Sequence, residues 1–155
     1  MRRILSIVLL GLFCGSANAQ AVDPGMVEGC FAAAGPGEVA PVCLGNAAGA
    51  CQSQGFDTTI GISQCIQAET AVWDQILNRE YKAVRGAFQG RFAGQTPLND
   101  MLLGAQRAWI AYRDAECALA YGRYADGTLR SIVAANCMMV MTAQRAIELR
   151  DMKEF

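Results

Sequence analysis

Hydrophobic residues between positions 62 and 88 recur every three or four residues, which is the spacing of one face of an α-helix. The pattern predicts a helix of about 25 to 30 residues. Gly86, Gly90 and Gly94 weaken helix formation toward its end. The apolar positions of this face are Ile62, Cys65, Ile66, Val72, Trp73, Ile76, Leu77, Tyr81, Val84 and Phe88.

A second helix is predicted to begin at Thr96 and Pro97, because threonine is a favourable N-cap and proline suits the first helical position. Asp100 then lies in the first turn, where a negative charge is favourable. Residues 122–127 begin and end with glycine and interrupt the helical pattern. The side chains expected to face the core are Leu98, Met101, Leu102, Ala105, Trp109, Tyr112 and Leu119.

A third helix is predicted to follow, with Thr128 as its N-cap, and to continue to the C-terminus. Its apolar positions are Leu129, Ile132, Val133, Val140, Ala143 and Ile147. Residues 20–60 are instead rich in Gly, Ala, Pro and Cys, and short helices are expected around Pro24–Ala33 and Pro41–Ser53. The predicted fold is therefore all-α, a small disulfide-stapled bundle of three long helices with one or two short N-terminal helices.

The first 19 residues have the pattern of a secretory signal peptide. Arg2 and Arg3 precede an apolar run of about ten residues, too short to span a bilayer, and Ala17-Asn18-Ala19 is a small-x-small cleavage site. Cys14 follows Phe13 where a lipoprotein would have a small residue, so a soluble product is expected. We predict a periplasmic or secreted protein without membrane insertion after cleavage, with one domain at 20–155: an extension at 20–60 and a helical core at 61–155.

The mature chain keeps six of the seven cysteines, an even number that in an exported domain predicts three disulfides. Local pairing is expected, because residues equidistant from a tight turn between two helices come together. The predicted pairs are Cys117 with Cys137 across residues 122–127, Cys51 with Cys65, and Cys30 with Cys43.

Charge is unevenly distributed along the mature chain. Removal of Arg2 and Arg3 leaves 11 of the 13 basic residues against 14 acidic ones, a net charge of −3. Residues 20–77 contain no lysine or arginine, and such a half can face a basic partner or simply be solvated. Its acids are Asp23, Glu28, Glu38, Asp57, Glu69 and Asp74.

The composition excludes several classes of function. The chain has no histidine, so Ser-His-Asp, Cys-His and His-zinc sites are impossible, and its dispersed basic residues form no stripe for nucleic acid. A Cu(I) site at Cys137-Met138-Met139-x-Met141 is an alternative to core packing with a disulfide, which we favour. Carboxylate pairs for sugar hydrolysis, Glu69 with Asp74 or Asp114 with Glu116, have no spacing that places them in one cleft. We predict a non-enzymatic protein without a metal or cofactor.

The densest motif is Gln106-x-x-Trp109-x-x-Tyr112-Arg113-Asp114-x-x-Cys117. Helical spacing places Gln106, Trp109 and Arg113 on one face, a combination that suits either ligand binding or the core. We favour the structural interpretation, in which Trp109 packs in the core and Arg113 pairs with an acid across the bundle. The acids considered for this pair are Glu69, Asp74 and Glu80.

These residues resemble the LprI family of bacterial envelope proteins. Besides the motif above, the resemblance rests on Cys65-x-x-x-Glu69-x-x-x-Trp73-Asp74-x-x-Leu77-Asn78-x-x-Tyr81, then Gly127 and Cys137, then Thr142-x-x-Arg145-x-x-x-Leu149, and covers about residues 43–150. It implies an exported, disulfide-bonded helical domain. Lysozyme inhibition is assigned to one member of the family, and most other members have no established activity.

Two functions follow as hypotheses. The first is an exported protein-binding module, specifically an inhibitor of lysozyme, whose positive charge complements the acidic half of this chain. The expected contacts are Asp23, Glu28, Glu38 and Asp57. The second is a structural or regulatory protein of the cell envelope that does not contact lysozyme.

Overall fold

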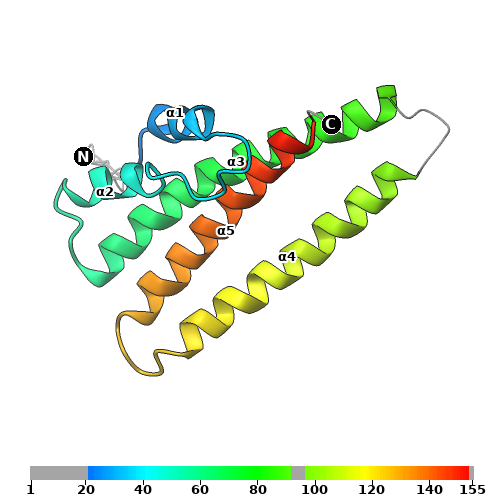
Figure 1. Cartoon of the computed structure of the whole chain (residues 1–155). Coiled ribbons are helices and arrows are strands. Elements are labelled where there is room, and N and C mark those ends of the chain that lie inside the picture. Colours follow the sequence, from blue (N-terminus) through cyan, green and yellow to red (C-terminus); the bar gives the residue numbers. More distant parts are fainter. Residues whose placement is uncertain (1–20, 92–96, 154–155) are drawn as a thin grey trace, which may run out of the picture.

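The computed structural model describes residues 21–91 and 97–153, and the regular structure within these ranges is entirely helical (Figure 1). The helices are α1 (Pro24–Ala33), α2 (Asn46–Gln52), α3 (Thr59–Arg91), α4 (Leu98–Gly122) and α5 (Arg130–Met152). The predicted all-α fold with three long helices is confirmed. The predicted signal peptide and Thr96 lie outside the described residues.

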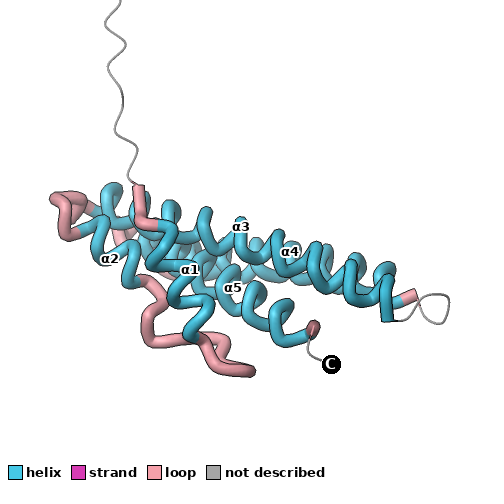
Figure 2. Tube along the Cα trace, turned by 90° about the horizontal axis from the view of Figure 1, so that it is seen from above, coloured by secondary structure: helices cyan, strands magenta, loops and turns pink. Residues whose placement is uncertain are grey.

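The three long helices run up, down and up, so that α3 and α5 are parallel and α4 is antiparallel to both (Figure 1). α5 packs along α3 and also against α4, whereas α3 and α4 touch each other little. α1 and α2 lie on α3, toward the end of the bundle remote from the link between α3 and α4 (Figure 2). Among the helices described, none is long and apolar enough to cross a membrane.

The core lies where α3 and α5 meet beneath α1. Trp73 and Ile76 of α3 and Ile147 and Leu149 of α5 are fully buried. Phe31 of α1 meets the Trp73 ring edge to face, with 6.3 Å between ring centroids. The apolar spacing that predicted the first and third long helices therefore marks the faces that form this core.

Glu69 attaches the N-terminal extension to α3. It is 1% exposed, and its carboxylate accepts hydrogen bonds from the backbone N–H groups of Gly45 (2.9 Å) and Ala48 (2.7 Å) at the start of α2. The indole N–H of Trp73 donates a third bond to the same carboxylate, at 3.1 Å. A negative charge thus satisfies the free donors of a helix N-terminus inside the protein.

Arg150 closes the other end of the extension. Its guanidinium donates to the carbonyl oxygens of Phe31, Ala34 and Gly35 at 2.9 to 3.1 Å, which lie at and just beyond the C-terminal end of α1. Asp151 accepts from the backbone N–H of Gly37 at 2.8 Å. The end of α5 therefore holds both α1 and the loop that follows it.

Three disulfides join Cys30 to Cys43, Cys51 to Cys65 and Cys117 to Cys137, with Cα–Cα distances of 5.5 to 5.7 Å. These are the three pairs expected from the sequence. The first closes the loop after α1, the second links α2 to α3, and the third links α4 to α5 on either side of their turn.

The prediction of the inward face of α4 was largely wrong. Leu102 is buried, but Met101, Tyr112 and Leu119 are 60 to 62% exposed, and Ala105 is exposed as well. α4 packs against the bundle through its opposite side, where its buried residues are Leu102, Gln106 and Cys117. Thr128 also does not cap α5: the N-cap is Leu129, and no side chain bonds the first turn.

Candidate functional site: a groove bounded by α3, α4 and α5

Three residues of the α4 motif, Gln106, Trp109 and Arg113, lie on the inner side of the helix, whereas Tyr112 and Asp114 are exposed. Gln106 is 7% exposed, and its side-chain oxygen accepts from the Nε of the buried Arg145 on α5, at 3.0 Å. The half-buried ring of Trp109 lies near two guanidinium groups, with Arg113 5.0 Å and Arg145 6.0 Å from its centroid. Both contacts are cation–π interactions, and they fix Trp109 between α4 and α5.

Arg113 does not pair with an acid across the bundle, so that expectation was wrong. Its guanidinium bonds the neighbouring Asp114 at 2.8 and 3.0 Å, and the Asp114 side chain is 55% exposed. The expected partners are bound elsewhere: Glu69 to the start of α2, and Glu80 to Arg79 and Lys153. The third, Asp74, accepts from the side-chain amide of Asn78 at 2.9 Å.

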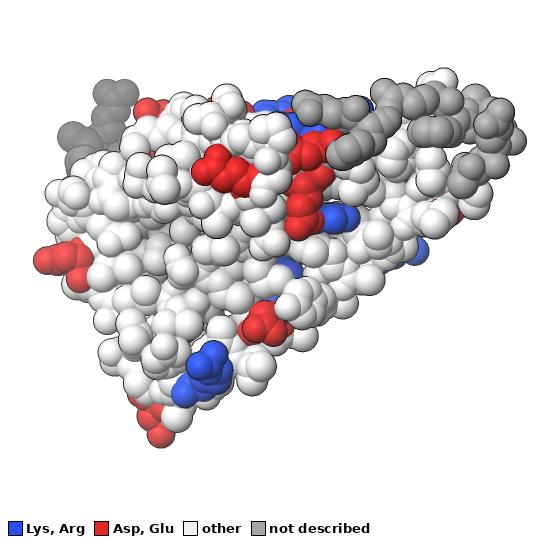
Figure 3. All heavy atoms as spheres, viewed as in Figure 1, with Lys and Arg blue, Asp and Glu red and all other residues white. Residues whose placement is uncertain are grey.

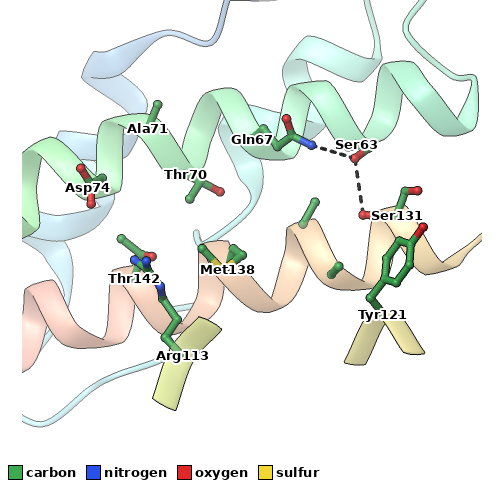
Figure 4. A pocket seen from close by; sticks show the side chains of 12 residues that line it. Ser63, Gln67, Thr70, Ala71, Asp74, Arg113, Tyr121, Ser131, Met138 and Thr142 are labelled. Atoms are coloured by element: carbon green, nitrogen blue, oxygen red, sulfur yellow. Dashed lines mark hydrogen bonds between the residues drawn. The ribbon is translucent and has the colours of Figure 1, made fainter. Parts of the chain in front are cut away.

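Asp74 and Arg113 instead face a groove that consists of two adjoining cavities, of about 630 and 280 Å³. Both residues line both cavities, so they mark the point where the cavities meet. Figure 4 shows the larger cavity, with Asp74, Thr70 and Gln67 along α3 and with Arg113 and Tyr121 reaching in from α4. The smaller cavity continues along Leu77, Asn78, Tyr81, Leu103, Gln106, Arg107, Trp109 and Ile110.

The wall of the groove on α3 is a row of polar side chains at helical spacing. Its members are Ser63, Gln67, Thr70, Asp74, Asn78 and Tyr81. Several of them bond within the protein: Gln67 donates to Ser63 at 3.1 Å, and Thr70 donates to the Ile66 carbonyl at 2.8 Å (Figure 4 shows the first bond).

Two buried hydroxyl groups that line the groove have no hydrogen-bond partner within the described structure. Thr142 of α5 is 0% exposed and lines the larger cavity, and Tyr81 lines the smaller one. Buried polar atoms in folded proteins nearly always have a partner. Unsatisfied hydroxyls in both cavities are therefore consistent with a partner that enters the groove.

The positions of the side chains bear on the two other sites considered from the sequence, a Cu(I) site and a catalytic carboxylate pair. Cys137 is bonded to Cys117, and the sulfur of Met141 lies 3.8 to 3.9 Å from their sulfurs, so this cluster offers no thiolate to copper. Glu69 is buried among backbone donors while Asp74 lines the groove, so these two do not share a cleft. The described part of the chain holds no cluster of metal-binding side chains.

The four acids proposed for partner binding lie apart from the groove, and most have a structural partner. Asp23 accepts from Gly25 at the start of α1, and Glu38 accepts from Gly35. Glu28 forms an ion pair with Arg79 at 2.7 Å. Asp57 is exposed in the loop before α3. The acidic side chains on the face shown in Figure 3 are scattered among uncharged surface rather than gathered in one patch.

Sequence reasoning missed the α3 side of the groove. It followed the apolar positions of that helix and identified Trp73, Asp74 and Asn78, but not Ser63, Gln67 or Thr70. The available signal was the polar row itself, whose residues recur at the same three- and four-residue steps as the apolar face.

Comparison with known proteins places this architecture in a family. The family model described as "Lysozyme inhibitor LprI" matches residues 51–149, which is well over half of the chain. An uncharacterized protein, R02472, of Rhizobium meliloti (strain 1021) is 31% identical over 100 residues, which cover 58% of this chain and 70% of that protein. No solved structure matches the chain significantly. Because the family model matches well over half of the chain, the chain belongs to the LprI family.

Proposed function

We propose that this protein is an exported, non-enzymatic protein-binding module that inhibits lysozyme. The observation that carries the proposal is the family match, which spans the end of α2, all of α3 and α4, and α5 as far as Leu149. Three disulfides support a location in an oxidising compartment, the periplasm or the exterior. The N-terminal signal pattern supports the same location.

The acids of the N-terminal extension are the proposed contacts with the basic enzyme. Asp23, Glu38 and Asp57 are exposed, and no basic side chain neutralises them within the described structure. Glu28 contributes less, since Arg79 compensates its charge. Charge complementarity of this kind increases the association rate and makes it sensitive to salt, because exposed charges are screened over about 8 to 10 Å at physiological ionic strength.

Clearing of a bacterial cell-wall suspension by lysozyme, followed as loss of turbidity, tests this function directly. We expect the purified, oxidised mature chain to slow the clearing, and to do so less as salt is added. A variant with D23N, E28Q, E38Q and D57N keeps one acceptor oxygen at each position but loses the four negative charges, and we expect weaker inhibition. A matched control also removes four charges, from exposed acids of α4 and its following turn: D100N, D114N, E116Q and D126N, in which Asp114 is ion-paired with Arg113 as Glu28 is with Arg79.

Comparison of the two variants distinguishes the effect of specific acidic contacts from the effect of total negative charge. Equal loss of inhibition in both would show that only total charge matters and would remove the proposed contacts. Inhibition that survives both the fourfold change and high salt would place the contact on the helices of the core. Absence of any effect on clearing at low salt would reject lysozyme inhibition.

A structural or regulatory role in the cell envelope is the second candidate. The observation that favours it is the use of the acids within the fold: Asp23 bonds the first turn of α1, Glu28 pairs with Arg79, and Glu38 bonds its own loop. Acids occupied in this way stabilise the extension without any partner. The same clearing assay decides between the two, since this role predicts no change in the rate at any salt concentration.

A further inference from the structure

We propose that the groove bounded by α3, α4 and α5 binds a linear, uncharged oligosaccharide. The site goes beyond lysozyme inhibition and lies apart from the acids proposed to contact that enzyme. Along α3 the lining residues extend from Ser63 to Tyr81, and 18 helical steps of 1.5 Å correspond to about 27 Å. The ligand is therefore elongated rather than compact.

The unpartnered hydroxyls show that the groove has hydrogen-bonding capacity that the fold does not use. Thr142 is fully buried at the floor of the larger cavity, and its hydroxyl has no partner. Tyr81 presents a second such hydroxyl to the smaller cavity. Between them lie Asp74 and Arg113, the two residues shared by both cavities. Each hydroxyl oxygen has less than 1 Å² of accessible surface, so a chain bound between them meets them once the side chains that cover them shift.

The groove has an apolar side and a polar side, as a chain of pyranose rings has apolar C–H faces and polar hydroxyl edges. The larger cavity has an apolar floor of Ala71, Ala134, Ala135 and Met138, which suits the C–H faces of sugar rings. The polar row of α3 forms one edge, where sugar hydroxyls would lie. Its side chains recur about every 5.4 Å, one helical turn, which is close to the length of one hexose unit in an extended chain.

Charge argues for an uncharged ligand. Arg113 pairs with Asp114, and the other charged residues that line the groove, Asp74 and Arg107, carry one negative and one positive charge, so the groove has no surplus of either sign. An extended peptide fits less well. The walls are α-helices whose backbone groups bond within each helix, so a peptide strand finds no backbone edge with which to pair.

Isothermal titration of the full mature chain with chitotetraose and with cellotetraose, in the absence of lysozyme, tests the proposal. We expect saturable binding of at least one of them, and amide chemical-shift changes confined to residues that line the two cavities. T142V removes a hydroxyl, and D74N replaces one carboxylate oxygen acceptor with an amide donor. We expect each to weaken binding about tenfold, the effect of losing one hydrogen bond to a polar or charged group. D57N serves as the control, because it makes the same chemical change outside the groove.

Folding of the variants is checked by thermal melting. T142V removes a hydroxyl that has no partner, so we expect it to melt no lower than the wild type, and Y81F provides an independent variant at the other cavity. The proposal is overturned if neither saccharide binds at millimolar concentration, or if D74N, T142V and Y81F bind as D57N does. Stronger binding of a blocked alanine tetrapeptide than of either saccharide would likewise overturn it in favour of a peptide site. None of these outcomes bears on lysozyme inhibition, which the clearing assay measures separately.

Discussion

Replacement of Glu69 is the most informative single test of how this fold is held together. In E69Q, one carboxylate oxygen becomes an amide that cannot accept a hydrogen bond. The wild-type carboxylate receives three donors, the N–H groups of Gly45 and Ala48 and the indole of Trp73. The glutamine therefore leaves at least one of these buried donors without an acceptor and removes the negative charge at the start of α2.

The expected cost follows from these losses. A buried donor left unpaired costs about 1 to 3 kcal/mol, and loss of a favourable charge at a partly buried helix N-terminus adds up to about 1 to 2 kcal/mol. We therefore expect E69Q to lower the free energy of unfolding by about 2 to 4 kcal/mol. A domain of ordinary stability has about 5 to 15 kcal/mol in total, so the effect is large.

Denaturant unfolding of the oxidised protein measures this loss as a lower transition midpoint at an unchanged slope. D74N is the matched control on the same helix, since Asp74 is exposed and bonds only Asn78, and we expect a change within about 0.5 kcal/mol. Equal midpoints for E69Q and D74N would refute the reasoning. They would mean that Glu69 contributes no more than a surface acid, and that the disulfides alone hold the extension.

Three further predictions concern other parts of the fold. R113A is expected to cost only about 1 kcal/mol in thermal or denaturant unfolding, because it removes one cation–π contact and one ion pair with an exposed acid. C117S with C137S is expected to cost about 3 kcal/mol by the same measurement, because it frees a loop of 20 residues. Burial opposes ionisation of Glu80, but hydrogen bonds from Lys153 and Arg79 outweigh this effect and lower the pKa of Glu80 below 4.5. The stability that ionised Glu80 contributes is therefore present above pH 4.5. It is lost as the pH falls through the lower pKa that Glu80 has in the folded state. E80Q is expected to be less stable at neutral pH and to lose less stability on acidification, and an acid limb as steep as that of the wild type would contradict this assignment.

The disulfides and the three long helices could be predicted because they depend on local information. Helical spacing shows which residues share a face, and a turn between two helices brings the cysteines on either side of it together. The bonds that hold the extension depend on long-range geometry instead. Arg150 reaches the carbonyl of Phe31, 119 residues away in sequence, and no spacing in either segment indicates that pairing.

Arg113 illustrates the same limit for the site. Its place on the inner face of α4 beside Trp109 follows from helical spacing, but its partner does not. The expected partner was an acid of α3, because a buried cation needs a buried anion. The side chain keeps 15% of its surface exposed and reaches its neighbour Asp114, so this requirement does not apply.

The inward face of α4 was predicted wrongly for a more general reason. Apolar spacing identifies a face, but α4 has two such faces: an inner one with Leu102, Trp109 and Cys117, and an outer one with Met101, Tyr112 and Leu119. Which one turns inward depends on α5, through the disulfide from Cys117 and the bond from Arg145 to Gln106. These two links hold α4 against α5 while leaving it little contact with α3. The groove exists for that reason, because a helix tethered to only one of its two neighbours leaves open the space beside the other.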